Sequence, residues 1–202
     1  MTLARKVSDE LQFNEVLASK HARYVNGVVV AKGSVAGDFS PQGTVLGRIS
    51  KVGHADLAKY GPVTRGAVAS SNTTANTVTL DTVADLFNFQ VGDKVELINT
   101  AGAIITGEGD REITAINTTT KVITLNAHTT NTDIALIQKN DGTAKAELVC
   151  LNLIDVTDED DLVGGIVHGA VYKARIPNYD DIVAADLPGI AFEDFAIQGA
   201  QA

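Results

Sequence analysis

The chain has 202 residues, of which 45% are hydrophobic and 20% are charged, and its net charge at pH 7 is -9. It contains no apolar run near the roughly 18 residues that span a bilayer, and no apolar signal segment follows Arg5 and Lys6, so we expect a non-membrane protein made in the cytosol. The negative charge argues against nucleic-acid binding, because phosphate neutralisation needs a basic face.

The charge is distributed unevenly along the chain. Residues 1–64 carry eight Lys or Arg and five Asp or Glu, whereas residues 147–202 carry two and eleven. Such asymmetry does not bear on the fold, but it favours surfaces of opposite sign that steer contacts between subunits.

The N-terminal part changes character at Gly27. Before it, Ser8 followed by acids and by spaced apolar residues is typical of a short N-capped helical turn, which is marginal alone. A frayed terminus and an arm that orders against a partner explain this segment equally well. After it, β-branched runs at 28–30 and 44–52, separated by Gly and Pro, predict short strands joined by turns.

Residues 70–132 are dense in Thr and Asn, and apolar residues recur there in short β-branched segments. The pattern predicts a small barrel or sandwich, with a helical turn at Asp85–Phe89 and a hairpin connection at Asn117–Thr120. The strand-like stretches are Thr77–Leu80, Lys94–Ile98, Arg111–Ile116 and Lys121–Leu125.

Clear strand patterns return after Ala146. Residues 147–154 and 165–175 predict strands, and residues 180–187 predict a short helix with acids in its first turn, stopped by Pro188. Cys150, the only cysteine, lies in the first of these strands. A single thiol excludes an internal disulfide and a cysteine-based zinc site, and its setting predicts a small buried hydrophobe.

The sequence offers no pattern of catalytic or cofactor-binding residues. Gly107–Asp110 lacks the third glycine of a nucleotide-binding loop and predicts a turn. Asp158–Asp161 lacks the ligand spacing of a calcium loop and predicts a solvated acidic loop. The histidines are scattered, without the spacing of a metal site, at His21, His54, His128 and His168. We therefore expect no enzyme, no metal and no cofactor.

A set of Gly-flanked strand motifs occurs in a fixed order and resembles the lambdoid tailed-phage head-decoration family. The resemblance covers about residues 27–60 and 139–195, and it is interrupted at 62–138, where that family has a short loop. In chain order the matching segments are Gly43–Ile49, Asp141–Val149, Leu153–Asp158, Val167–Val171 and Gly189–Phe192.

The resemblance implies a mainly β protein with three parts. Residues 1–26 would be an N-terminal capsid-binding arm. Residues 27–64 and 139–202 would form a discontinuous decoration-type β-fold with short helices. Residues 65–138 would be an inserted small β-barrel or sandwich, exposed at the surface because insertions are tolerated at loop tips.

The resemblance also implies a function. A capsid decoration protein of this family binds the outer surface of the mature head as homotrimers, contacts the major capsid protein through the arm, and stabilises the shell against packaged-DNA pressure. It is made in the host cytoplasm and resides in the virion. The inserted domain could contact a host surface. The expected capsid contacts are Arg5, Lys6, Phe13, Lys20, Arg23 and Tyr24.

Two other classes fit the composition. A tail or baseplate structural protein would also be β-rich and free of catalytic motifs, and only the order of the motifs separates it from a head protein. The second is a carbohydrate-binding surface module with residues 65–145 as its sugar-binding part. Such modules usually offer aromatic platforms, whereas the aromatic residues of this segment are only Phe87 and Phe89.

Overall fold

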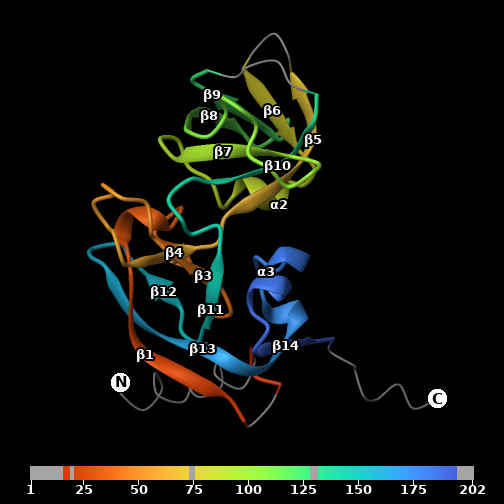
Figure 1. The fold of residues 1–202 in the computed structure, drawn as a ribbon. Coiled ribbons are helices and arrows are strands. Elements are labelled where there is room, and N and C mark those ends of the chain that lie inside the picture. Colours follow the sequence, from red (N-terminus) through yellow and green to blue (C-terminus); the bar gives the residue numbers. More distant parts are fainter. Residues whose placement is uncertain (1–15, 19–20, 73–75, 128–131, 195–202) are drawn as a thin grey trace, which may run out of the picture. The chain divides into compact units, whose positions relative to one another are not determined.

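The computed structural model describes residues 16–18, 21–72, 76–127 and 132–194 (Figure 1). The chain divides into two compact units, each built from more than one segment. The first unit comprises Met1–Arg48, Lys59–Gly61 and Lys145–Ala202, and the second comprises Ile49–Ala58 and Pro62–Ala144.

Residues 49–58, 62–64 and 139–144 belong to the second unit, whereas the sequence analysis assigns them to the first; the loop 49–58 is the longest of these segments. Its contacts explain the difference. The backbone N–H groups of Ser50 and Lys51 donate to the carbonyl of Asp141 at 3.0 and 3.1 Å. The ammonium of Lys51 lies 2.9 Å from a carboxylate oxygen of Asp110. These contacts join residues that are far apart in the chain, so the sequence pattern within residues 49–58 does not predict them.

The fold is mainly β, as the sequence predicts. The strands of the first unit, of which β4 reaches one residue into the second, are β1 (Arg23–Val30), β2 (Phe39–Ser40), β3 (Val45–Arg48), β4 (Tyr60–Pro62), β11 (Ala146–Cys150), β12 (Ile154–Asp155), β13 (Asp161–Tyr172) and β14 (Ile190–Glu193). Two 3₁₀ turns occur at Lys32–Ser34 and Lys173–Arg175.

The main sheet of the first unit runs in the order β1-β4-β3-β11-β13-β14. Because β1 also pairs with β13, the first five of these strands close into a ring. Strand β13 is long enough to serve several neighbours: its first part pairs with β1 and β11, and its last four residues pair in parallel with β14. The short strands β2 and β12 form a separate two-stranded sheet.

A hydrophobic core fills this unit. Inward side chains of β1, β11 and β13 pack together, and alternation along β1 buries Val28 and Val30 but leaves Val29 half-buried. The buried members of the cluster are Val28, Val30, Val35, Leu46, Leu148, Cys150, Ile154, Val156 and Val163.

Helix α3 (Asp181–Asp186) confirms the helix predicted near the C-terminus. A carboxylate oxygen of Asp180 accepts a hydrogen bond from the Val183 N–H at 2.6 Å, so Asp180 is the N-cap. Asp181 adds an acid in the first turn, where the helix dipole favours negative charge. The helix buries Val183 and ends before Pro188.

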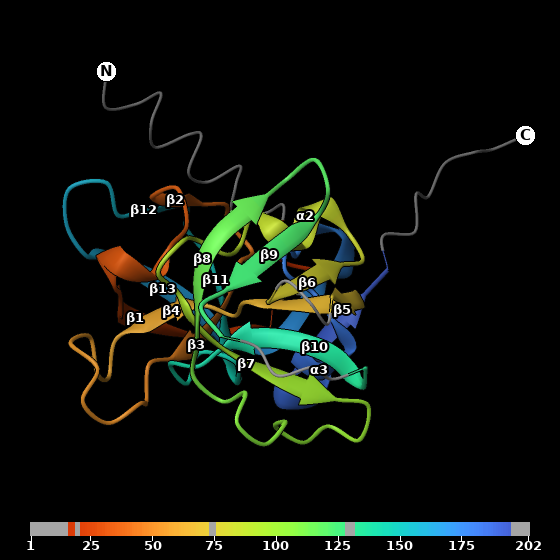
Figure 2. The same cartoon turned by 90° about the horizontal axis from the view of Figure 1, so that it is seen from above.

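The second unit is a closed six-stranded barrel in the order β10-β5-β6-β9-β8-β7. Figure 2 shows these strands following one another around the barrel. Every neighbouring pair is antiparallel. The strands are β5 (Arg65–Asn72), β6 (Thr77–Leu80), β7 (Lys94–Asn99), β8 (Arg111–Asn117), β9 (Val122–Leu125) and β10 (Ile134–Lys139).

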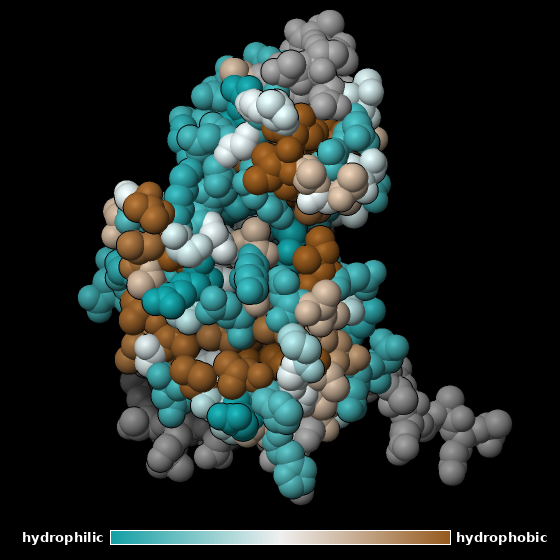
Figure 3. Space-filling model, viewed as in Figure 1, coloured by the Kyte–Doolittle hydropathy of each residue, from teal (hydrophilic) through white to brown (hydrophobic). Residues whose placement is uncertain are grey.

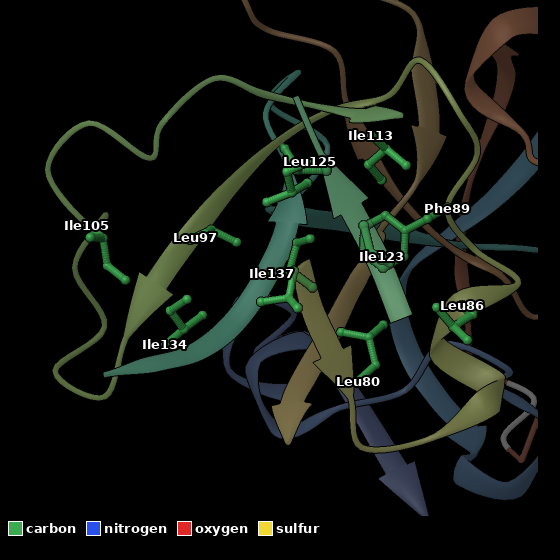
Figure 4. Close-up of a cluster of buried hydrophobic side chains, with 12 residues drawn as sticks. Leu80, Leu86, Phe89, Leu97, Ile105, Ile113, Ile123, Leu125, Ile134 and Ile137 are labelled. Atoms are coloured by element: carbon green, nitrogen blue, oxygen red, sulfur yellow. The ribbon is translucent and has the colours of Figure 1, made fainter. Parts of the chain in front are cut away.

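Alternating side chains fill the barrel. In both β6 and β9, the second and fourth residues are fully or almost fully buried, while their neighbours are half-buried. Figure 4 shows the apolar side chains of the different strands pointing toward one another. The buried cluster is Val78, Leu80, Leu86, Phe89, Val95, Leu97, Ile105, Ile113, Ile123, Leu125, Ile134 and Ile137. The barrel therefore has a core of its own.

Side-chain to backbone hydrogen bonds determine two local features of the barrel that the sequence predicts, a hairpin and a helical turn. The hairpin at Asn117–Thr120 is confirmed. The Asn117 side-chain oxygen accepts hydrogen bonds from the backbone N–H groups of Thr119 and Thr120, and Lys121 adopts a positive φ. The helical turn predicted at Asp85–Phe89 begins earlier, as α2 (Val83–Leu86), because the hydroxyl of Thr82 caps it by accepting from the Asp85 N–H.

Candidate interaction surface

Cys150 is buried, as its strand context predicts. Desolvation raises the pKa of its thiol to about 12, outweighing backbone hydrogen bonds of Asn152 and Leu151 that lower it. Sγ also lies 3.3 Å from the carbonyl oxygen of Asn152, to which the neutral thiol donates. Because the thiolate is the nucleophile, this residue is chemically inert in the folded protein.

We therefore expect no labelling of Cys150 by a thiol reagent at pH 8 in the native protein, where roughly one thiol in 10,000 is ionised. Labelling should become complete once the chain is unfolded in guanidinium chloride. Mass spectrometry measures both states. Rapid native labelling at a rate independent of unfolding would contradict the burial of this strand.

The acidic loop at Asp158–Asp161 is held by two lysines of its own unit, one through its backbone and one through its ammonium group. The Lys32 N–H donates to a carboxylate oxygen of Asp160 at 3.0 Å, and the Lys59 ammonium lies 2.6 Å from the other oxygen. The hydrogen bond from Lys59 is the main reason that the pKa of Asp160 lies below its usual value. Across the described residues, no group of three or more His, Cys, Asp or Glu is arranged to hold a metal ion.

The segment Gly107–Asp110 forms the predicted turn, with a positive φ at Gly107, but it contains a buried charge that the sequence does not reveal. Glu108 is fully buried, and its Oε2 lies 2.6 Å from Nε of Arg111. Arg111 and Lys139 both pair with Val95, so their side chains share the inner face of the barrel. The ammonium of Lys139 lies 3.3 Å from a carboxylate oxygen of Asp93.

Four segments of the motif pattern meet in the first unit. Gly43–Ile49 contains β3, Asp141–Val149 leads into β11, Val167–Val171 lies in β13 and Gly189–Phe192 contains β14. These four strands are consecutive neighbours in one sheet, although about 100 residues separate β3 from β11 in the chain. Strand pairing therefore brings these motif segments together; Val45 of β3, for example, lies opposite Val149 of β11.

The backbone conformation at position 43, the first residue of this pattern, requires a glycine. Its φ is +86°, and a Cβ at this position would overlap the carbonyl oxygen of Arg175. Its N–H donates to the carbonyl of Cys150 at 2.9 Å, which joins the turn before β3 to the end of β11. A side chain would therefore disturb two contacts between distant segments.

Two of the six residues expected to contact a capsid are described by the structure. Arg23 and Tyr24 begin β1, opposite His168 and Ile166 of β13, and both are exposed. The other four lie outside the described residues: Arg5, Lys6, Phe13 and Lys20. The structure thus gives Arg23 and Tyr24 a common position at the start of one strand.

Part of the surface of the first unit is apolar, and we name this part the β1–β13 band. Figure 3 shows apolar side chains extending across this face of the first unit, over β1, β12 and β13. The exposed large apolar residues on or beside these strands and β2 are Tyr24, Val25, Phe39, Leu153 and Leu162; Tyr24 and Val25 are consecutive in β1, so their side chains lie on opposite faces of that strand. Exposed apolar patches of this kind commonly mark interaction sites.

Comparison with protein-family models, curated proteins and solved structures found no match for this chain. Within the described ranges, none of the helices has the length and apolar character needed to cross a membrane. The features that bear on function are therefore the β1–β13 band, the order of the motif strands and the two-unit organisation.

Proposed function

We propose that this protein is a virion structural protein that decorates the outside of a tailed-phage capsid. The observation that carries the proposal is the adjacency of β3, β11, β13 and β14, because four of the five segments of the head-decoration pattern fall on these neighbouring strands; the fifth, Leu153–Asp158, contains β12, which pairs with β2 in a separate sheet.

In this proposal the protein acts by mechanical attachment. Homotrimers bind the mature head, and residues 1–26 contact the major capsid protein, with Arg23 and Tyr24 at the point where the arm joins β1. Pairing of an extended arm with a capsid strand would satisfy backbone groups at an exposed edge. Many weak contacts act together, and a protein that binds only the expanded shell stabilises that state by mass action.

The decisive experiment is a count of copies in the virions of the phage that encodes the protein. Quantitative mass spectrometry of purified heads and purified tails should find hundreds of copies on heads and almost none on tails. A reconstruction of the head should show the protein at three-fold positions on the outer surface. A few copies confined to tails would instead establish the tail or baseplate alternative and reject the head assignment.

In this proposal the barrel is a separate module that stands outward from the capsid and does not make the main capsid contact. Its first and last strands are neighbours: Arg65 pairs with Gln138, and the Lys139 N–H donates to the Thr64 carbonyl at 3.1 Å. Paired residues of antiparallel strands are only about 5 Å apart, so a very short linker can replace everything between them.

We therefore expect that replacing residues 65–138 with a short Gly/Ser linker preserves the fold of the first unit and its binding to heads. Closing a short flexible loop costs little entropy, and the two units have separate cores. Circular dichroism and co-sedimentation with heads measure the outcome. Loss of cooperative unfolding in the shortened chain would show that the barrel belongs to the core architecture.

The barrel gives no support to a carbohydrate-binding function. Of the two aromatic residues in 65–138, Phe89 is buried in the barrel core, which leaves Phe87 as the exposed ring. A sugar platform usually needs aromatic rings presented to solvent. Contact of the barrel with a host surface remains part of the proposal only as a secondary role.

A further inference from the structure

We infer that Asn26 and Gly27 form a site of spontaneous modification, at which the side-chain amide is lost as ammonia and a carboxylate is gained from water. Asn26–Gly27 is the only Asn–Gly pair in the chain. It lies in β1, which runs beside β13 (Figure 1), and both residues are exposed. The reaction needs no partner other than water, so the inference does not rest on the head-binding proposal.

The chemistry follows from the two residue types. The backbone nitrogen of Gly27 attacks the side-chain carbonyl carbon of Asn26, the new C–N bond closes a five-membered succinimide ring, and the amide nitrogen leaves as ammonia. Water then opens the ring at either carbonyl, which gives an aspartyl residue or an isoaspartyl linkage that runs through the side chain. Glycine favours the attack because no Cβ shields its nitrogen. The product adds a negative charge to β1, close to Arg23 and Tyr24 at the start of the same strand.

A β-bulge takes this pair out of the regular ladder between β1 and β13. The register gains one residue on β1 between Val25 and Val28, so Asn26 and Gly27 together lie opposite Gly164. A bulge leaves its extra residue without a ladder partner. On its other edge, β1 pairs with β4 only at the last residue of the strand. Because a reaction between neighbouring groups is fast only where the reacting atoms can reach the attack geometry, this lack of restraint favours ring closure.

The surroundings of the bulge leave room for the ring. A Cβ built on Gly27, which has φ +78°, would meet no neighbouring atom within 4 Å. Across from the bulge, Gly164 has no side chain, and a Cβ there would lie 3.7 Å from Oδ1 of Asn26. No hydrogen bond to another described residue holds the Asn26 carboxamide. The side chain is therefore free to turn toward the Gly27 nitrogen.

Two other sites of related sequence are restrained and serve as internal controls. Asp141–Gly142 can form the same ring, but Oδ1 of Asp141 accepts hydrogen bonds from the N–H and the hydroxyl of Thr143. Asn117 is exposed like Asn26, but its side-chain oxygen accepts two backbone hydrogen bonds, and the next residue is the β-branched Thr118. Both sites should stay unchanged while Asn26 converts.

The test is peptide mapping of the full chain before and after incubation in mildly alkaline buffer, beside a synthetic peptide with the sequence of residues 24–32. Trypsin releases the same segment from the protein, because it follows Arg23 and ends at Lys32. After incubation this peptide should show the mass gain of an amide-to-acid change and separate by chromatography into aspartyl and isoaspartyl forms. The peptides that carry Asn117 and Asp141 should show neither change. Conversion should accelerate with pH, since the attacking nitrogen must lose its proton.

Asn26→Gln is the matched control variant, because glutamine keeps the amide but would have to close a less favourable six-membered ring. The mass gain should be lost in this variant, and circular dichroism checks that the chain remains folded. The inference is overturned if Asn26 stays an amide in the folded protein while the synthetic peptide converts, because the pairing of β1 would then block the attack. It is also overturned if Asn117 converts as fast as Asn26, or if Asn26→Gln leaves the mass gain unchanged.

Discussion

Substituting Gly43 by alanine should lower the free energy of unfolding of the first unit by about 2–6 kcal/mol. Two costs add up. A non-glycine residue held at a positive φ costs about 1–3 kcal/mol, and Gly43 has φ +86°. Forcing a methyl group into occupied space costs a further 1–3 kcal/mol or so, and here the space is occupied by the Arg175 backbone, which yields less easily than a side chain.

Gly33→Ala provides the matched control for Gly43→Ala. Gly33 lies in the same unit and needs no positive φ, and an added methyl group would meet no neighbouring atom within 4 Å, so the effect should be small. Urea unfolding followed by circular dichroism measures both variants. Equal stability of the two would show that the turn before β3 relaxes without cost.

Removing the carboxylate of Glu108 should destabilise the barrel by about 3–5 kcal/mol, the typical cost of leaving one member of a buried ion pair without its partner. In Glu108→Ala the Arg111 guanidinium, whose side chain is 21% exposed, loses the carboxylate that lies 2.6 Å from its Nε. The loss should appear in the unfolding of the barrel while the first unit is unaffected, because the cores are separate.

Asp110→Ala is the control, two residues away in the same turn. Asp110 is 63% exposed and pairs with Lys51 at 2.9 Å, so removing it should cost less than about 1 kcal/mol. Replacing Glu108 and Arg111 together by leucine should recover most of the loss, since an apolar pair of similar size avoids the buried charge. Urea unfolding of all three variants checks these values. A loss that persists in the double variant would mean that shape at this site matters more than charge.

The strands that were predicted and those that were missed differ in their local pattern. Strands β6, β7, β8 and β9 carry β-branched residues in short alternating runs, and each was expected within a residue or two of its bounds. Strand β5, with the sequence Arg-Gly-Ala-Val-Ala-Ser-Ser-Asn, has little of this pattern, and neither β5 nor β10 was predicted as a strand. Both form because pairing with neighbouring strands provides hydrogen-bond partners for their backbone N–H and C=O groups.

The sequence by itself determined the features that depend on neighbouring residues: the mainly β class, the hairpin at Asn117–Thr120, the acid-capped helix α3 and the burial of Cys150 in its strand. Such features follow from side-chain periodicity, turn residues and caps, which act over a few positions. Only the tertiary structure decided the closure of the barrel, the buried pairing of Glu108 with Arg111 and the adjacency of β3 with β11. These depend on strand pairing between distant segments, and a local pattern does not specify which distant strand supplies the partner.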